Sequence, residues 1–328
     1  MNFTYRLIRP DEEATAVAFW SEMFAYDYDE MYKEYSTDSD RLSQTYVAVD
    51  PYGHIAATAG YCVRSIRDNT GEPQRTGCVW NVATAPQFQR RGLARHLMHI
   101  TLDAMVINGC TWSFLDASPY GRPLYAQLQY TAINSPYWDG TIFHHPEGND
   151  GYVVRTYDPR NEVQGWESLS NIYNSYNHNT PLTTVRDITY WTSGYAHYRY
   201  TLWLAQRKVI LAAFTNANRA RPIGYLAADF GEDNFQILEI GVMKEHTGAL
   251  NCLISSAIQT ALYKGYSHGR FWLSHDERSR HIISPFFNEL RKGQENHIMA
   301  RSLMREKAKT LEETIFSPNA MQWMIDNV

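Results

Sequence analysis

The stretch QRRGLA at residues 89–94 lies where a β-rich run gives way to the amphipathic run RHLMHITLDAMVING at 95–109. Gly92 has no side chain, so the backbone N–H groups around it are free to point into an anionic group at the first turn of the predicted helix. A helix N-terminus carries roughly half a positive charge, and Arg90 and Arg91 add cations at its rim. The stretch therefore predicts a strand–turn–helix unit with a site for a pyrophosphate-sized anion.

Composition limits the classes of protein and partner. The chain has 328 residues, 44% of them hydrophobic, and we expect two domains because this exceeds one average domain. A net charge of −5 argues against a nucleic-acid binder or a protein held on an anionic membrane, since both need a basic excess. The four cysteines show no paired spacing, and no apolar run could serve as a leader or a membrane span. We therefore expect a cytoplasmic protein with reduced thiols and no metal.

The order of predicted elements repeats along the chain. The first half predicts a strand, a helix, a hairpin, a strand, the helix at 91–108 and a further strand. After Gly151, YVVRTYDPRNEV repeats YRLIRPDEEATA, and FQILEIGVM with ALNCLISSAIQTALYKG repeats the strand and helix. An internal duplication with a period of roughly 160 residues explains the length better than two unrelated domains. The predicted parts are 1–150, 151–305 and a tail helix in 306–328, with the linker FHHPEGNDG between the first two.

The run VATAPQFQRRGLARHLM resembles the acyl-coenzyme-A-binding motif Q/R-x-x-G-x-G/A of the GNAT superfamily of N-acetyltransferases. Gln89, Gly92 and Ala94 fill its three fixed positions. SPYGRPLYAQLQY at 118–130 is similar to a second segment of that family, which ends in L-Y-x-x-x-G-F. The resemblance covers residues 3 to 138. It implies an α/β fold of two GNAT-like domains, each a mostly antiparallel sheet with a central pair of parallel strands and flanking helices.

The resemblance also implies acetyl-coenzyme A as the cofactor. Its pyrophosphate would bind the backbone of the six-residue motif, and its pantetheine arm would pair with the preceding strand as an added strand does. Ser118 stands where many family members carry an asparagine that contacts the cofactor, and its hydroxyl can still donate. The implied cofactor-binding residues are Val82, Thr84, Gln89, Arg90, Arg91, Gly92, Leu93, Ala94 and Ser118.

The resemblance assigns Tyr125 as the acid that protonates the departing thiolate, in a direct transfer of the acetyl group to a primary amine. Gln129 replaces the family's glycine four residues later, a change that we expect to alter a turn rather than the chemistry. The base stays open, because the strand before the motif contains no Asp or Glu. Asp116, Glu72 and a water chain held by Asn81 are the alternatives.

Acids and aromatic residues alternate in FAYDYDEMYKEYSTD at 24–38. Acids beside aromatic faces suit an ammonium or polyamine substrate, whereas a solvated acidic helix is the structural alternative. The acceptor would be a small-molecule or peptide amine. A non-catalytic acyl-coenzyme-A sensor is the rival function, and a homodimer is left open. The expected substrate-binding residues are Tyr26, Asp27, Tyr28, Asp29 and Glu30.

The second copy lacks the features that carry this chemistry. VMKEHTG at 242–248 is too short for the same phosphate loop, and Phe287 stands where the first copy has Tyr125. We therefore predict a degenerate GNAT-like domain that closes the cleft, positions the first domain or holds another ligand. An aromatic series in this copy indicates a core or interdomain contact; it comprises Trp191, Tyr195, Tyr198, Tyr200 and Trp203.

Overall fold

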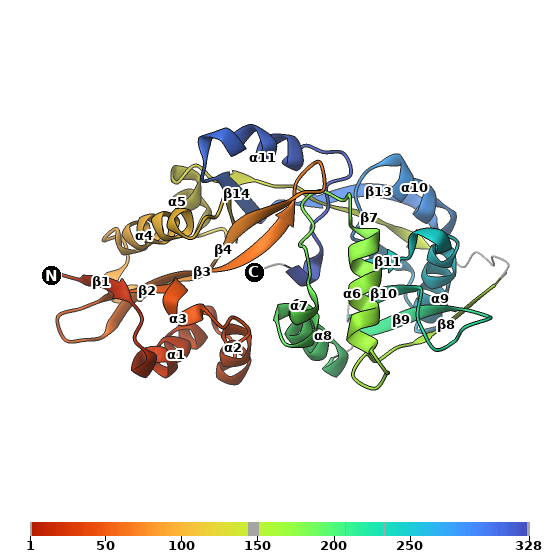
Figure 1. The fold of residues 1–328 in the computed structure, drawn as a ribbon, viewed down its shortest axis with the longest axis horizontal. Coiled ribbons are helices and arrows are strands. Elements are labelled where there is room, and N and C mark those ends of the chain that lie inside the picture. Colours follow the sequence, from red (N-terminus) through yellow and green to blue (C-terminus); the bar gives the residue numbers. More distant parts are fainter. Residues whose placement is uncertain (1, 144–150, 207, 232–233, 327–328) are drawn as a thin grey trace.

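The computed structural model describes residues 2–143, 151–206, 208–231 and 234–326. The predicted linker histidines, His144 and His145, lie outside these residues. The chain forms two seven-stranded sheets, one in each half of the molecule, with helices on the faces of both (Figure 1). The predicted α/β class, with two sheets that each have flanking helices, is confirmed.

The first sheet has seven strands, and its one parallel pair of neighbours, β4 and β5, lies at its centre. In order across the sheet the strands are β1 (Thr4–Leu7), β2 (Thr45–Val49), β3 (Ile55–Arg67), β4 (Pro73–Thr84), β5 (Trp112–Asp116), β14 (Ile298–Ser302) and β6 (Thr131–Ala132). Its helices are α1 (Glu13–Phe24), α2 (Tyr28–Tyr35), α3 (Arg41–Gln44), α4 (Leu93–Ile107) and α5 (Arg122–Gln127).

The second sheet repeats this arrangement, with β11 and β12 as its parallel pair. Its strands, in order, are β13 (Phe287–Glu295), β7 (Ser135–Ile142), β12 (His268–Phe271), β11 (Phe235–Val242), β10 (Gly224–Phe230), β9 (Lys208–Thr215) and β8 (Tyr152–Thr156). The helices are α6 (Gly165–Tyr176), α7 (Ile188–Thr192), α8 (Tyr195–Ala205), α9 (Ala249–Tyr263) and α10 (Glu277–Ile283). The tail helix α11 (Ala308–Ile315) instead packs on β14 of the first sheet.

The two sheets exchange one strand each. β7 follows the first sheet in sequence but pairs with β12 and β13 of the second. β14 comes from the end of the second half but lies between β5 and β6 of the first. The division of the chain at residue 150 therefore describes the sequence order and not the sheets, and the exchange ties the two halves together.

An ion pair at the start of each half marks the duplication. Arg6 on β1 binds Glu12 at 2.7 Å, and Arg155 on β8 binds Glu162 at 2.6 Å. Each acid follows a proline, in the segments YRLIRPDEEATA and YVVRTYDPRNEV that repeat each other in the sequence. The Arg6 guanidinium lowers the pKa of Glu12 to about 2, because it donates hydrogen bonds to the carboxylate.

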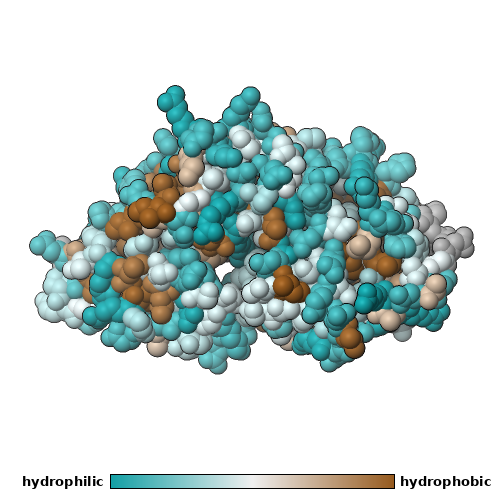
Figure 2. Space-filling view, in the orientation of Figure 1, coloured by the Kyte–Doolittle hydropathy of each residue, from teal (hydrophilic) through white to brown (hydrophobic). Residues whose placement is uncertain are grey.

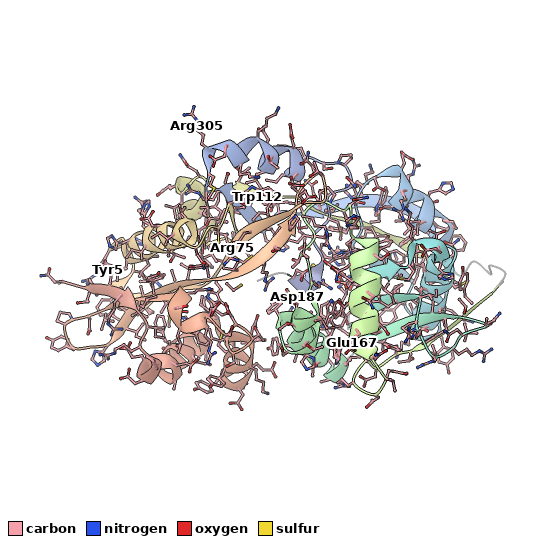
Figure 3. The ribbon with its side chains drawn as sticks, viewed as in Figure 1. Tyr5, Arg75, Trp112, Glu167, Asp187 and Arg305 are labelled. Atoms are coloured by element: carbon pink, nitrogen blue, oxygen red, sulfur yellow. The ribbon has the colours of Figure 1, made fainter. Side chains whose placement is uncertain are left out.

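α4 packs on one face of the first sheet, where apolar side chains of the helix and of β3, β4 and β5 form one core. The opposite face of that sheet turns toward α7 and α8 of the second half, across the gap in the centre of Figure 1. Asp187, which caps the start of α7, lies beside this gap in Figure 3. The functional site is built on that face.

Candidate functional site

A cavity of about 740 Å³ lies between the two halves. The first half contributes α2, the middle of β3, the end of β4 and the last residues of β5. The second half contributes α7 and the start of α8. Figure 2 shows the molecule hollowed between the halves at this place. Tyr125 of the first half and Tyr190, Tyr195 and Arg199 of the second all line the cavity.

The cavity opens where β4 and β5 separate. Their parallel pairing ends at Val79 opposite Leu115, although β4 continues to Thr84 along β3. β4 carries an irregularity just beyond this point, with Asn81 in the left-handed region at φ 49°. The Thr58 hydroxyl donates to the Asn81 carbonyl at 2.6 Å and accepts from the Trp20 indole at 2.9 Å. This buried chain fixes the bulge that parts the strands.

Among the predicted residues of β4, Val82 lines the cavity and Thr84 lies at the end of the strand. The Gln89 side chain donates to the Thr84 carbonyl at 3.3 Å, which ties the motif to the strand. Ser118 also lines the cavity, and its hydroxyl accepts the Gly121 amide at 3.1 Å.

The turn at residues 89–94 presents its backbone outward. Gly92 has φ 80° and Arg90 has φ 60°, and a Cβ on Gly92 would meet no atom within 4 Å. The amides of Arg90, Arg91 and Gly92 donate to no recorded acceptor in the described part of the chain. The first turn of α4 contains no acid, while the buried Leu93 anchors it in the core. Free amides, two arginines and a helix N-terminus together are features that suit an anion, and we call residues 89–94 the anion-binding turn for this reason.

Tyr125 on α5 is buried, with 7% of its surface exposed. Its ring centre lies 6.0 Å from the ring centre of Tyr130. Burial, together with the nearby Asp116, raises the pKa of Tyr125 to about 12, so its hydroxyl keeps its proton at neutral pH. Gly121 makes room for the ring, since a Cβ there would lie 2.8 Å from Cε2 of Tyr125. Gln129 adopts φ 65°, a left-handed conformation that glycine reaches without strain.

The three alternatives for the base differ in whether they line the cavity. Asp116 and Asn81 line the cavity. Burial raises the pKa of Asp116, while His297, whose Nε2 lies 3.9 Å from Oδ2, opposes that rise. Glu72 lies in the turn between β3 and β4, where its amide donates to Asp68, and it does not line the cavity. Asp116 is thus the carboxylate of the three that shares the cavity with Tyr125.

Of the five residues of the acidic stretch that were predicted to bind substrate, only Tyr26 lines the cavity. Asp27 caps α2 by accepting the Glu30 amide at 3.0 Å, and Tyr28 stacks on Tyr32. Asp29 is exposed. Glu30 accepts a hydrogen bond from Tyr198 of the second half at 3.3 Å. Most of the stretch therefore forms helix ends and contacts between the halves.

The sequence reasoning missed several lining residues. Glu34 and Asp38 lie further along the same acidic stretch, and extending the expected site by two turns would have included them. Arg64 on β3 and the second-half residues Tyr190 and Arg199 gave no signal, because nothing in the sequence tells which elements of the two halves will face each other. Tyr195 belongs to the aromatic series expected at a core or interdomain contact, and its hydroxyl donates to Glu34 of the first half.

In the second sheet the parallel pairing of β11 with β12 likewise ends early, at Ile237 opposite Phe271, although β11 continues to Val242 along β10. Gly248 at the start of α9 is right-handed, with φ −62°, and Phe287 packs on Phe271 at 4.7 Å. The face that corresponds to the cavity wall is filled by a buried ionic cluster. In it, Arg186 binds Glu239 at 2.6 Å and Asp326 at 2.8 Å, and Tyr200 and Tyr225 also donate to Glu239.

No cluster of three potential metal ligands occurs among residues 2–143, 151–206, 208–231 and 234–326. No helix in the described part of the chain has the length and apolar character needed to cross a membrane.

Residues 4–133 match the family described as the acetyltransferase (GNAT) domain. A comparison with curated proteins gives no match. Among solved structures, a GCN5-related N-acetyltransferase from Anabaena variabilis has a TM-score of 0.70 at 12% identity, with 92% of this chain and 73% of that chain covered. Eis1 from Mycobacterium abscessus has a TM-score of 0.66 at 13% identity, with 92% and 74% covered.

A tandem GNAT protein from the clavulanic acid biosynthesis pathway matches over 92% of this chain and 99% of its own length, with a TM-score of 0.52 at 12% identity. Residues 4–133 therefore match a GNAT acetyltransferase domain, and the described part of the chain has the fold of tandem GNAT proteins. The fold supports acyl transfer as the class of reaction.

Proposed function

We propose that the chain is an acetyl-coenzyme-A-dependent N-acetyltransferase that acts on the primary amine of a small molecule or peptide. One observation carries the proposal: a buried tyrosine hydroxyl that stays protonated shares a cavity with Asp116 at the point where β4 and β5 separate. The anion-binding turn at residues 89–94 follows the same strand. The family match over residues 4–133 supports this assignment.

The residues present fit the cofactor. The backbone at Arg90, Arg91 and Gly92 offers free amides for a pyrophosphate, with the Arg90 and Arg91 side chains beside them. Val82 and Thr84 have no partner on β5, because that pairing ends at Val79. Their backbone is therefore available to a strand-like arm, and Ser118 would contact the cofactor from the cavity wall. When bound, the cofactor supplies the acetyl group as a thioester.

The chain's own residues would supply proton transfer and orientation. In the reaction a carbon–nitrogen bond forms between the acyl carbon and the amine, and the carbon–sulfur bond breaks. Tyr125 would give its proton to the departing sulfur. Asp116 would take the proton that the amine nitrogen loses, directly or through water held by Asn81. No covalent enzyme intermediate is needed, and Cys62, on the cavity wall, packs beside Cys78 within the sheet.

The test measures free thiol release from acetyl-coenzyme A across a panel of amino acids, diamines, aminoglycosides and short peptides. We expect release that depends on at least one amine, with one acetylated product per thiol. Binding of the cofactor without transfer to any amine would overturn the proposal and favour a sensor of acyl-coenzyme A.

A further inference from the structure

Arg64 is a buried cation on the cavity wall. It lies on β3, opposite Thr76 of β4, and is 7% exposed. Its Nη1 donates to the backbone carbonyl of Asp326 at 2.5 Å. No ion pair joins Arg64 to an acid within the described part of the chain. Its remaining guanidinium N–H groups have no recorded carboxylate acceptor there, although the side chain lines the cavity.

This arrangement contrasts with Arg186 in the second half. Arg186 is also buried, but it binds the carboxylates of both Glu239 and Asp326. A buried guanidinium is costly unless an anion compensates it. Asp38 on the cavity wall interacts with the charge of Arg64, which opposes the rise that burial causes in the Asp38 pKa, but no hydrogen bond or ion pair joins the two side chains. Arg186 has carboxylates in direct contact within the fold, so the comparison indicates that a ligand in the cavity supplies the anion that contacts Arg64.

Two tyrosines of the second half frame the Arg64 guanidinium. Its central carbon lies 4.3 Å from the ring centre of Tyr195 and 5.8 Å from that of Tyr190. The Tyr190 hydroxyl donates to Asp326 at 3.0 Å, and the Tyr195 hydroxyl donates to Glu34 at 3.2 Å. The rings therefore sit in fixed positions and hold the planar guanidinium, the group best suited to bidentate binding of a carboxylate.

The cavity also has an acidic part. Asp116 is the last residue of β5 and shares the cavity with Tyr125, and Asp38 and Glu34 lie on the α2 side. Asp116 and Arg64 both line a small adjoining cavity, so they are close neighbours on this wall. One wall thus offers carboxylates to an ammonium group and a guanidinium to an anion.

We propose that the acceptor is an amine that also carries a carboxylate, an amino acid or a compound like one, and that Arg64 binds its carboxylate while the amine lies at Asp116 and Tyr125. This inference rests on the proposed function. It gives the second half a role in choosing the substrate, since Tyr190 and Tyr195 position Arg64. It also replaces a polyamine as the expected acceptor, because Asp27, Asp29 and Glu30 do not line the cavity.

The carboxylate belongs to the acceptor and not to the acyl group. The cofactor would enter along the separated ends of β4 and β5, whereas Arg64 lies further back on β3, between the sheet and α7 and α8. A dicarboxylic acyl group would be the other source of the anion, and the test includes it.

The test measures binding by calorimetry with saturating coenzyme A, so that no turnover is needed. The probes are lysine and phenylalanine, each paired with the amine left by its decarboxylation, cadaverine or phenethylamine. We expect at least one amino acid to bind about tenfold or more tightly than its paired amine. Arg64→Gln should abolish this advantage and leave the amine unchanged, whereas Arg64→Lys should keep part of it. The control is Arg75→Gln, since Arg75 bonds Asn108 outside the cavity.

Equal binding of both members of every pair, or an equal loss for both in Arg64→Gln with a normal melting temperature, would overturn the proposal. Arg64-dependent binding of succinyl-coenzyme A over acetyl-coenzyme A would overturn it in favour of the acyl group. Failure of the proposed function is a separate result: amino acids would bind through Arg64, but no thiol would be released.

Discussion

The two halves share a fold and differ in what lies against the inner face of each sheet. In the first half that face borders a cavity of about 740 Å³ that contains Tyr125. In the second half, Arg186, Glu239 and Asp326 fill the corresponding place, each almost completely buried. One copy has therefore kept an opening, and the other has become a packed support whose α7 and α8 complete the wall of its neighbour's cavity.

The largest expected effect concerns the packed half. Arg186→Met would leave two carboxylates buried without their cation, and we expect a loss of about 3–5 kcal/mol in the free energy of unfolding. Urea denaturation measures it. Arg291→Met, which changes a side chain 76% exposed, should cost almost nothing. A loss below about 1 kcal/mol for Arg186→Met would show that the cluster does not support the second half.

The next effect concerns the open half. Tyr125→Phe makes the first copy resemble the second, which has Phe287 at the matching place in the sequence. We expect kcat to fall about 100-fold with little change in the affinity for coenzyme A, because the proton donor is lost while the cofactor turn stays intact. Tyr120→Phe is the control, since Tyr120 is 97% exposed. Undiminished turnover in Tyr125→Phe would show that Tyr125 is not the proton donor of the reaction.

A smaller effect compares the repeated ion pairs. The folded pKa of Glu12 lies near 2, below its ordinary value of 4.5, so its contribution to stability is present above about pH 4.5 and is lost as the pH falls toward 2. Glu12→Gln should cost about 1 kcal/mol at pH 7 and almost nothing near pH 2. Glu162→Gln should cost less, because that side chain is 27% exposed and Glu12 is 10%. Unfolding at several pH values checks both, and a pH-independent loss for Glu12→Gln would contradict the account.

The smallest effect concerns the turn after α5. Gln129 has φ 65°, a conformation that glycine adopts without strain. Gln129→Gly should raise the free energy of unfolding by about 0.5–1 kcal/mol, measured as a higher melting temperature. A lower melting temperature would mean that contacts of the glutamine side chain outweigh the backbone strain.

The sequence predicted the two copies and the turn at Gly92, because these depend on local patterns such as proline, glycine and helical period. Tyr125, which lines the cavity, was selected only through the resemblance of residues 118–130 to a GNAT segment. It did not predict the exchange of β7 and β14, since alternation in a strand does not specify which sheet the strand joins. Arg64 was missed for a related reason. A charged residue within a predicted strand indicates a solvated face, whereas α7, α8 and the segment at Asp326 together cover Arg64.

The central claim is that the first half alone holds the cofactor, and a calorimetric titration with coenzyme A tests it most directly. Wild-type protein should bind one molecule per chain. Gly92→Glu would place a carboxylate in the open space at the turn and should weaken binding about 100-fold or more. The matched change Gly248→Glu, at the start of α9, should leave binding intact. Two molecules per chain, or a loss of binding in Gly248→Glu and not in Gly92→Glu, would contradict the account.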